Sequence, residues 1–159
     1  MKLIDSRKIT FLLVTIIMPM ALSKSYTRLE YPEVIQILED YSRKYPESIQ
    51  LDDASIQYNQ LLNERMCGKN LCKHPVVTLT NFKSPSEEIS KRPQVLLIGS
   101  MHGNEIVGTN TLVRFIQKAA ENRYGNFWNL LNTRMIVIVP MANPHGFYNV
   151  KRVKRIDNQ

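Results

Sequence analysis

The chain has 159 residues, of which 43% are hydrophobic and 22% charged, and its formal net charge at pH 7 is +7. This length is enough for one domain with its own core, and the composition excludes a wholly disordered or collagen-like chain. The excess of basic residues is moderate. It favours acidic partners, but it does not require nucleic acid, and we expect no nucleic-acid binding.

The N-terminus has the pattern of a secretory signal peptide. An apolar run over 9–22 follows a positive start, and Ala21 and Ser23 stand at the right offsets for cleavage after Ser23. A membrane anchor is the alternative, but the run has about 14 residues and a spanning helix needs about 20. We therefore expect a signal peptide at 1–23, no stable membrane span after its removal, and a location outside the cell or in the secretory-pathway lumen. The positive start consists of Lys2, Arg7 and Lys8.

The next segment has the pattern of an amphipathic helix from Tyr31 to Lys44. Pro32 is suited to the first turn, and the carboxylate of Glu33 lies beside the positive end of the helix dipole. Pro46 then ends the helix. The apolar residues recur at helical spacing and predict a buried face: Val34, Ile37, Leu38 and Tyr41.

Two strands are predicted on either side of a cysteine pair, over 49–58 and 76–80. Cys67 and Cys72 are the only cysteines of the sequence. In an oxidising compartment, two cysteines this close indicate a local disulfide that clamps the turn between the strands. Half of a metal site is the alternative, but the sequence has no further cysteine to complete a thiolate zinc site. The small loop between them limits the entropic stabilisation that the disulfide provides.

The second half of the chain has the pattern of a strand, a helix and a strand. A polar loop over 83–93 precedes a short continuous apolar run over 95–99, which is typical of a strand buried on both faces. A helix with one apolar face is predicted over 105–123, and a second buried strand over 135–140. The connection is long enough for a right-handed crossover between parallel strands, which indicates an α/β domain.

Two polar segments follow the two predicted strands, at 102–105 and at 143–147. Because the strands are expected to be parallel neighbours, both segments lie beyond the carboxyl ends of adjacent strands. Ligand sites of open α/β sheets form at this edge. The sequence therefore predicts that the functional site is located there.

His102 and Glu105 are the candidate metal ligands. They stand three positions apart at a strand-to-helix turn, where Gly103 allows a tight bend and both side chains can point at one ion. Zinc accepts neutral imidazole nitrogen and carboxylate oxygen, and zinc-bound water ionises near neutral pH and can attack a carbonyl. One such pair arises by chance in about one chain in five. The alternative is a turn histidine hydrogen-bonded to the backbone, with Glu105 serving the first helical turn.

Four features together resemble the zinc metallocarboxypeptidases of the carboxypeptidase A type. The strand and His-Gly-Asn-Glu turn over 96–105 resemble that family's ligand pair, and 137–147 resembles its strand followed by Asn-Pro-Asp-Gly-Phe or Tyr. Tyr31-Pro-Glu-Val and Tyr45-Pro46 resemble its first helix, and the order and spacing of the three agree. The resemblance covers 26–159 and implies an α/β fold with an open mixed sheet and helices on both faces.

The resemblance implies a secreted metallocarboxypeptidase that removes C-terminal residues from peptides or proteins with a Zn²⁺-activated water. His102 and Glu105 would be the first two zinc ligands, while a second histidine and a glutamate general base would follow beyond Gln159. Arg152, with Arg155 as second choice, would polarise the scissile carbonyl, because a guanidinium stays charged and offers two donors to the oxygen. A solvated basic loop is the alternative for both arginines.

The chain departs from the family pattern at a histidine and at its end. His145 stands where the family has Asp, and a surface turn is favoured over a ligand there. His74 lies upstream on a predicted strand and is interpreted as structural. The family domain is about twice this length, so we expect 24–159 to be the N-terminal part of it, as a fragment or an incomplete gene model. Such a half-domain would expose apolar strand edges and have negligible activity alone. The full-length protein is expected to be a monomer.

Two other functions remain open at this point. The related zinc amidoacylases also carry His-Gly-Asn-Glu but act on small N-acyl amino acids. The Asn-Pro-His-Gly-Phe segment at 143–147 and the secretory signal argue against that reading. A secreted, non-catalytic binding protein is the other alternative, in which the basic cluster at 151–155 would meet an anionic surface.

Overall fold

The computed structural model describes residues 27–57, 65–122 and 125–151. The expected signal peptide at 1–23 and the candidate residue Arg152, with Arg155, lie outside the described residues. Within the described ranges, no helix is both long enough and apolar enough to cross a bilayer.

Four strands form the central sheet in the order β1-β4-β6-β5. The pairs β1–β4 and β4–β6 are antiparallel, whereas β5 and β6 are parallel. The α/β class and the open mixed sheet expected from the sequence are therefore confirmed, and so is the parallel strand-helix-strand unit. The bounds are β1 Ile49–Asp53, β4 Pro75–Leu79, β5 Gln94–Ile98 and β6 Met135–Val139.

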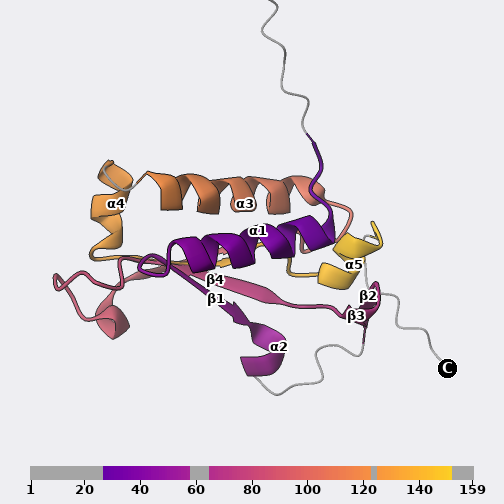
Figure 1. Ribbon diagram of the computed structural model, residues 1–159, viewed down its shortest axis with the longest axis horizontal. Coiled ribbons are helices and arrows are strands. Elements are labelled where there is room, and N and C mark those ends of the chain that lie inside the picture. The colour runs from indigo at the N-terminus through magenta and orange to yellow at the C-terminus, as the bar shows by residue number, and fades with distance from the viewer. Residues whose placement is uncertain (1–26, 58–64, 123–124, 152–159) are drawn as a thin grey trace, which may run out of the picture.

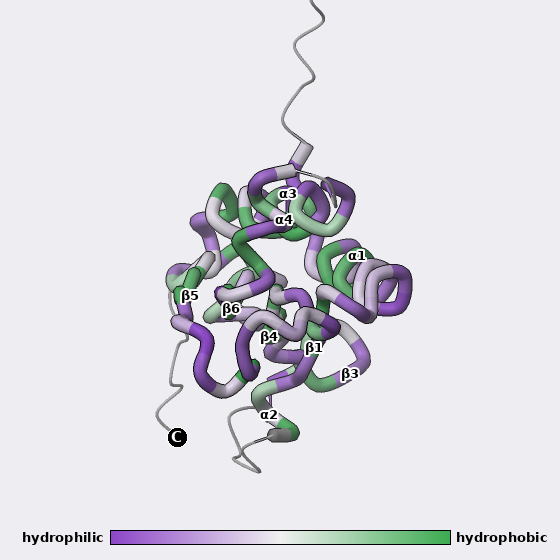
Figure 2. Tube along the Cα trace, turned by 90° about the vertical axis from the view of Figure 1, so that its left-hand side faces the viewer, coloured by the Kyte–Doolittle hydropathy of each residue, from purple (hydrophilic) through white to green (hydrophobic). Residues whose placement is uncertain are grey.

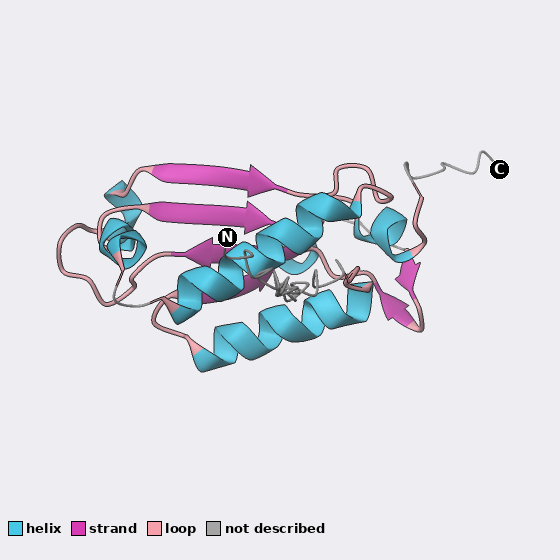
Figure 3. Cartoon of the chain, turned by 90° about the horizontal axis from the view of Figure 1, so that it is seen from above, coloured by secondary structure: helices cyan, strands magenta, loops and turns pink. Residues whose placement is uncertain are grey.

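The two long helices, α1 (Tyr31–Lys44) and α3 (Ile106–Glu121), lie side by side on one face of this sheet (Figures 1 and 3). A capping box starts α1, in which the backbone N–H of Glu30 donates to the Glu33 carboxylate at 2.7 Å. The two helices are also joined through their side chains. The Tyr41 hydroxyl on α1 donates to the Glu121 carboxylate on α3 at 2.6 Å.

The hydrophobic core lies between these helices and the sheet. The strand register places the buried side chains of neighbouring strands on the same face, as in the pairs Val77–Ile138 and Leu79–Ile136. Val34 and Leu38 of α1 pack onto this face, and α3 adds further buried apolar side chains. The helical spacing read from the sequence thus identifies the core-facing side of α1. The buried apolar residues of α3 are Val113, Ile116, Ala119 and Ala120.

The other face of the sheet is apolar near β5 but exposed. The register places Leu96 beside Val137 and Ile98 beside Val139, on the side opposite the core pairs. Leu96 is 59% and Ile98 49% exposed. Both long helices of the described residues cover the core face, and Figure 2 shows the hydrophobic strand β5 at one edge of the sheet. The prediction that this strand is buried on both faces is wrong for the described structure, because both of its long helices lie on the opposite face of the sheet.

The remaining elements are short. The predicted strand over 49–58 ends at Asp53, because the Asp53 carboxylate accepts hydrogen bonds from the backbone N–H and the hydroxyl of Ser55 and so begins α2. Between α2 and β4, a two-stranded hairpin carries the expected Cys67–Cys72 disulfide. The short elements are α2 Ala54–Gln57, β2 Met66–Cys67, β3 Asn70–Leu71, a 3₁₀ turn η1 Ile89–Lys91, α4 Asn126–Leu131 and α5 Pro144–Tyr148.

The polar loop before β5 folds around a buried arginine. Arg92 is 2% exposed, and its guanidinium donates to the Thr80 hydroxyl at 2.7 Å and to the carbonyl oxygens of Asn81 at 2.8 Å and Glu87 at 2.9 Å. The carbonyls of Ser84 and Leu131 also accept from it. This guanidinium therefore supplies the hydrogen bonds that the loop backbone would otherwise lack.

Candidate metal centre

The segments that follow β5 and β6 are hydrogen-bonded to one another beyond the ends of the strands. The Gly99 N–H donates to the Val139 carbonyl at 2.9 Å, and the Ala142 N–H donates back to the Gly99 carbonyl at 2.9 Å. The Asn143 N–H donates to the Ser100 carbonyl at 3.1 Å. The two polar segments expected at the carboxyl edge of the sheet thus form one connected site.

The turn that presents the candidate ligands begins with a strained backbone at Ser100. Its φ angle is +42°, in the left-handed region that non-glycine residues rarely adopt. Its buried hydroxyl lies 2.8 Å from the Glu105 carbonyl and 2.7 Å from the Thr109 hydroxyl, which in turn donates to the Pro140 carbonyl at 2.6 Å. This chain of contacts fixes the turn to α3 and to the end of β6, which holds the strained conformation in place.

Two glycines let the turn approach its neighbours closely. A Cβ atom on Gly103 would lie 2.0 Å from the backbone carbon of Gly146 in α5. A Cβ atom on Gly99 would lie 2.6 Å from the carbonyl oxygen of Pro140. No larger residue fits either position without movement of the backbone, so the ligand turn is packed directly against the segment that follows β6.

His102 and Glu105 meet at the open side of this turn. Nδ1 of His102 lies 3.1 Å from Oε1 of Glu105, and the Glu105 N–H donates to the His102 carbonyl at 3.0 Å. The side chains are 39% and 55% exposed and border an open hollow of about 680 Å³. Glu105 is the N-cap residue of α3, and its side chain makes no capping hydrogen bond. Its carboxylate nevertheless lies at the N-terminus of α3, where the helix dipole favours a negative charge, so this alternative to a metal ligand stays open.

The donor set fits two positions of a zinc site. Zinc takes imidazole nitrogen and carboxylate oxygen, and a catalytic site uses three protein ligands and a water. His102 and Glu105 supply one donor of each kind from a rigid turn, with their nearest polar atoms 3.1 Å apart. Among the residues that the structure describes, no group of three or more His, Cys, Asp or Glu side chains is placed to hold a metal ion.

The other histidines have different surroundings. Nδ1 of His145 lies 3.2 Å from the carbonyl oxygen of Met66 in the hairpin, and the Asn149 amide lies against its ring. His145 thus lies on the short helix α5 and contacts the hairpin, and not on the surface turn expected from the sequence. His74 precedes β4, and its backbone N–H donates to the Asp53 carboxylate at 3.1 Å. The structure thus brings His102 and Glu105 together without either histidine.

A family model described as zinc carboxypeptidase matches residues 47–159. The chain belongs to the zinc carboxypeptidase family. The match includes the whole β5–α3–β6 unit and the His102–Glu105 turn. It therefore places the candidate ligands of this zinc carboxypeptidase chain inside the family domain.

Curated relatives carry names from the same family. The chain is 37% identical over 83 residues to carboxypeptidase E of Caenorhabditis elegans, which is 50% of this chain and 18% of that protein. It is 38% identical over 83 residues to human carboxypeptidase Z, covering 50% of this chain and 13% of the relative. The zinc carboxypeptidase chain therefore spans less than a fifth of the length of these relatives.

Solved structures show the same fold. The carboxypeptidase A of Helicoverpa armigera superposes with a TM-score of 0.58 at 18% identity, over 81% of this chain and 29% of that one. Thrombin-activatable fibrinolysis inhibitor superposes with a TM-score of 0.58 at 14% identity, over 86% of this chain and 33% of that one. The likeness covers most of this zinc carboxypeptidase chain and about a third of each neighbour.

The sequence identifies the candidate pair His102 and Glu105, but not the residues that position it. Ser100 and Thr109 carry no motif of their own, and their contact depends on how α3 packs against the turn. Gly146 could have been recognised from the sequence as a position of close backbone approach, because each of the two segments beyond the adjacent strands contains a glycine. That Gly103 is the residue it contacts becomes evident only in the folded structure.

Proposed function

We propose that this chain is part of a secreted zinc-dependent metallocarboxypeptidase that hydrolyses the C-terminal peptide bond of peptides or proteins. His102 and Glu105 are proposed as two of its three protein zinc ligands, with Zn²⁺ as the cofactor. The observation that carries this proposal is the His102–Glu105 pair, with Nδ1 and Oε1 3.1 Å apart at the carboxyl edge of the β5–β6 pair, in a chain of the zinc carboxypeptidase family.

The residues of the chain have separate tasks in this function. His102 and Glu105 would hold the ion, and the hydrogen-bonded turn around Ser100 would keep both donors at fixed positions. When bound, the zinc supplies an activated water and polarises the carbonyl. A third ligand and a general base must come from outside the described residues. Arg152 is proposed to bind the scissile carbonyl, as the resemblance implies, and stands outside them as well.

The substrate is proposed to be the free C-terminus of a peptide. The test uses the polypeptide translated from the complete natural transcript, with peptides that have either a free or an amidated C-terminus. We expect release of single C-terminal residues from the free peptide only, loss of activity after chelation and recovery with zinc. His102→Ala should remove the activity, while His145→Ala, a histidine outside the ligand turn, should retain it.

Three results would contradict this function. Cleavage within the peptide, or of the amidated peptide at the same rate, would exclude a carboxypeptidase. Hydrolysis of N-acyl amino acids in preference to peptides would favour an amidoacylase. A folded, zinc-loaded protein without either activity would favour a non-catalytic binding protein.

A further inference from the structure

A second pocket lies at the opposite edge of the sheet from the ligand turn. The sheet order places β1 at one edge and β5 at the other, with β4 and β6 between them. The pocket has a volume of about 280 Å³ and is formed by α1, β1, α2 and the start of β4. Its position separates it from His102 and Glu105, so it is not a part of the proposed metal centre.

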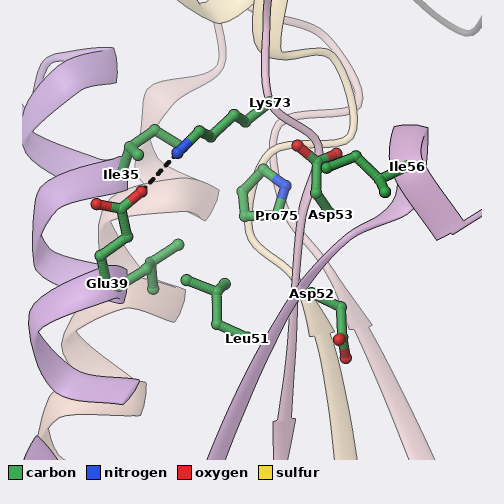
Figure 4. Close-up of a pocket in the computed structure, with 9 residues that line it drawn as sticks. Ile35, Glu39, Leu51, Asp52, Asp53, Ile56, Lys73 and Pro75 are labelled. Carbon is green, nitrogen blue, oxygen red and sulfur yellow. Dashed lines mark hydrogen bonds and ion pairs between the residues drawn. The ribbon is translucent and has the colours of Figure 1, made fainter. Parts of the chain in front are cut away.

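The floor of this pocket is apolar. Ile35 and Leu38 of α1 line one side, and Leu51 and Pro75 line the sheet side. Figure 4 shows Ile56 of α2 forming the far wall. Ile56 is 78% exposed, so an apolar wall faces solvent here. Covering an apolar surface of this kind with an aliphatic chain lowers the free energy of the complex.

The rim of the pocket is acidic, although the chain as a whole is basic. Three carboxylates and one ammonium group line it, those of Glu39, Asp52, Asp53 and Lys73. The Lys73 ammonium is already paired with Glu39 at 2.6 Å, and this hydrogen bond raises the pKa of Lys73. Figure 4 shows the carboxylates of Glu39 and Asp53 on either side of Pro75, while Asp52 points away below. The charge left on the rim is therefore negative.

Asp53 is held ionised at this rim. Burial alone would raise the pKa of its carboxyl, but hydrogen bonds from the Ser55 hydroxyl and from the backbone N–H groups of His74 and Ser55 outweigh burial and lower it. These donors all contact Oδ1, at 2.6 to 3.1 Å. The carboxylate is thus fixed in position and charged at neutral pH.

We propose that this pocket binds an arginine side chain of a partner polypeptide. The side chain of arginine is an aliphatic stem with a cationic end, and such stems cover apolar surface while the charge stays at a polar rim. The stem would lie on Leu51, Pro75 and Ile56, and the guanidinium would donate to Oδ2 of Asp53, because Oδ1 already accepts three hydrogen bonds. A neighbouring hollow of about 440 Å³ shares the lining residues Ile35, Glu39 and Lys73, and gives room for the partner backbone.

The test uses the full chain and a blocked tripeptide, N-acetyl-Gly-Arg-Gly amide, with a metal chelator present. The amidated end of the peptide and the chelator prevent binding at the proposed metal centre. A negative result for the arginine pocket is therefore distinguishable from a failure of the proposed carboxypeptidase function. The comparison peptide has citrulline, a neutral isostere, in place of arginine. Binding is followed by the amide NMR signals of Leu51 and His74 during titration and by calorimetry.

We expect the arginine peptide to bind at least about tenfold more tightly than the citrulline peptide, and more weakly as salt is added. Asp53→Asn retains an oxygen for the Ser55 and His74 donors, and should weaken binding about tenfold. Ile56→Ser changes a residue that is 78% exposed and lies outside the hydrophobic core, and should weaken binding about threefold. Glu88→Gln is the matched control, because Glu88 is an exposed carboxylate of the loop before β5, and it should leave binding unchanged.

Equal affinity for the arginine and citrulline peptides would overturn the proposal. Equal affinity of the Asp53→Asn and Glu88→Gln variants for the arginine peptide would also overturn it. So would a titration that does not saturate, or one in which other amide signals shift while those of Leu51 and His74 do not.

Discussion

Strand β5 carries a polar cluster at each end, and the two clusters differ in burial and in their partners. At its start, Arg92 is 2% exposed, and its guanidinium donates to a hydroxyl and four backbone carbonyls. At its end, the His102 and Glu105 side chains are 39% and 55% exposed and contact one another. A buried polar group with all its bonds inside the protein stabilises the fold, whereas exposed donors on a fixed turn are available to a ligand.

The backbone conformations at the two ends of β5 are also held by different contacts. The loop around Arg92 is shaped by the guanidinium, whose donors reach carbonyls on both sides of the loop. The ligand turn is shaped by Ser100 at φ +42° and by the contact between Gly103 and Gly146. Strained backbone that surrounding contacts hold in place is typical of functional sites. The comparison therefore supports a structural role for the first cluster and the proposed metal-binding role for the second.

The largest effect is expected at the buried cluster. Arg92→Met should lower the free energy of unfolding by about 3–4 kcal/mol, because five acceptors lose their donor in a buried loop. Urea denaturation measures this loss. Arg134→Met is the matched control, since Arg134 is exposed and its side chain donates to a neighbouring carbonyl, and it should change stability by less than about 0.5 kcal/mol. Equal losses in the two variants would contradict the structural role of Arg92.

The next largest effect is expected at the glycine contact. Gly103→Ala should cost about 2–3 kcal/mol, because its Cβ would lie 2.0 Å from the Gly146 backbone and the turn must move. The displaced turn should also bind zinc more weakly. Asn104→Ala changes the neighbouring exposed residue and serves as the control. A Gly103→Ala protein with unchanged stability and unchanged zinc affinity would show that this contact does not position the ligands.

A smaller effect is expected at the hydroxyl chain. Thr109→Val keeps the side-chain shape but removes the bond to the Pro140 carbonyl and the contact with Ser100, at a cost of about 1–2 kcal/mol. Thr78→Val, on half-buried β4, is the control. Thermal unfolding with and without zinc separates the two effects. If zinc raises the melting temperature of Thr109→Val as much as that of the unchanged protein, the hydroxyl chain supports the fold alone.

The smallest effect is expected far from both ends of β5, between α1 and α3. The hydrogen bond to Glu121 raises the pKa of Tyr41 from 10.0 to about 12, and the same bond lowers the pKa of Glu121 below 4.5. The first shift adds stability below pH 10 that is lost as the pH rises toward 12, and the second adds stability above pH 4.5 that is lost as the pH falls.

Tyr41→Phe should therefore have a slightly lower free energy of unfolding than the unchanged protein between about pH 4.5 and pH 10, and the difference should become smaller below and above this range. Unfolding measured across the pH range tests this, with Tyr148→Phe as the control. A difference independent of pH would indicate that packing, and not this hydrogen bond, accounts for it.

Much of the fold follows from local sequence patterns. The spacing of apolar residues gives α1 with its bounds, and the apolar runs before and after α3 give two parallel strands. Burial of β5 could not be predicted, because a run of apolar residues is the same in a covered strand and in an exposed edge. The proposed ligand pair could be recognised in the sequence because its two members are close together in the chain. The roles of Arg92, Ser100 and Thr109 could not be recognised, because their partners come from segments that only the folded chain brings together.

The most direct test of the metal centre is a zinc titration of the chain against a chromophoric chelator, with any affinity tag removed. The unchanged chain, His102→Ala, Glu105→Gln and His145→Ala are compared, the last as a histidine outside the ligand turn. We expect His102→Ala and Glu105→Gln each to weaken zinc binding by about tenfold or more, and His145→Ala to have no effect. Unchanged affinity in His102→Ala, or a loss in His145→Ala of the same size, would contradict the assignment of this turn as the zinc site.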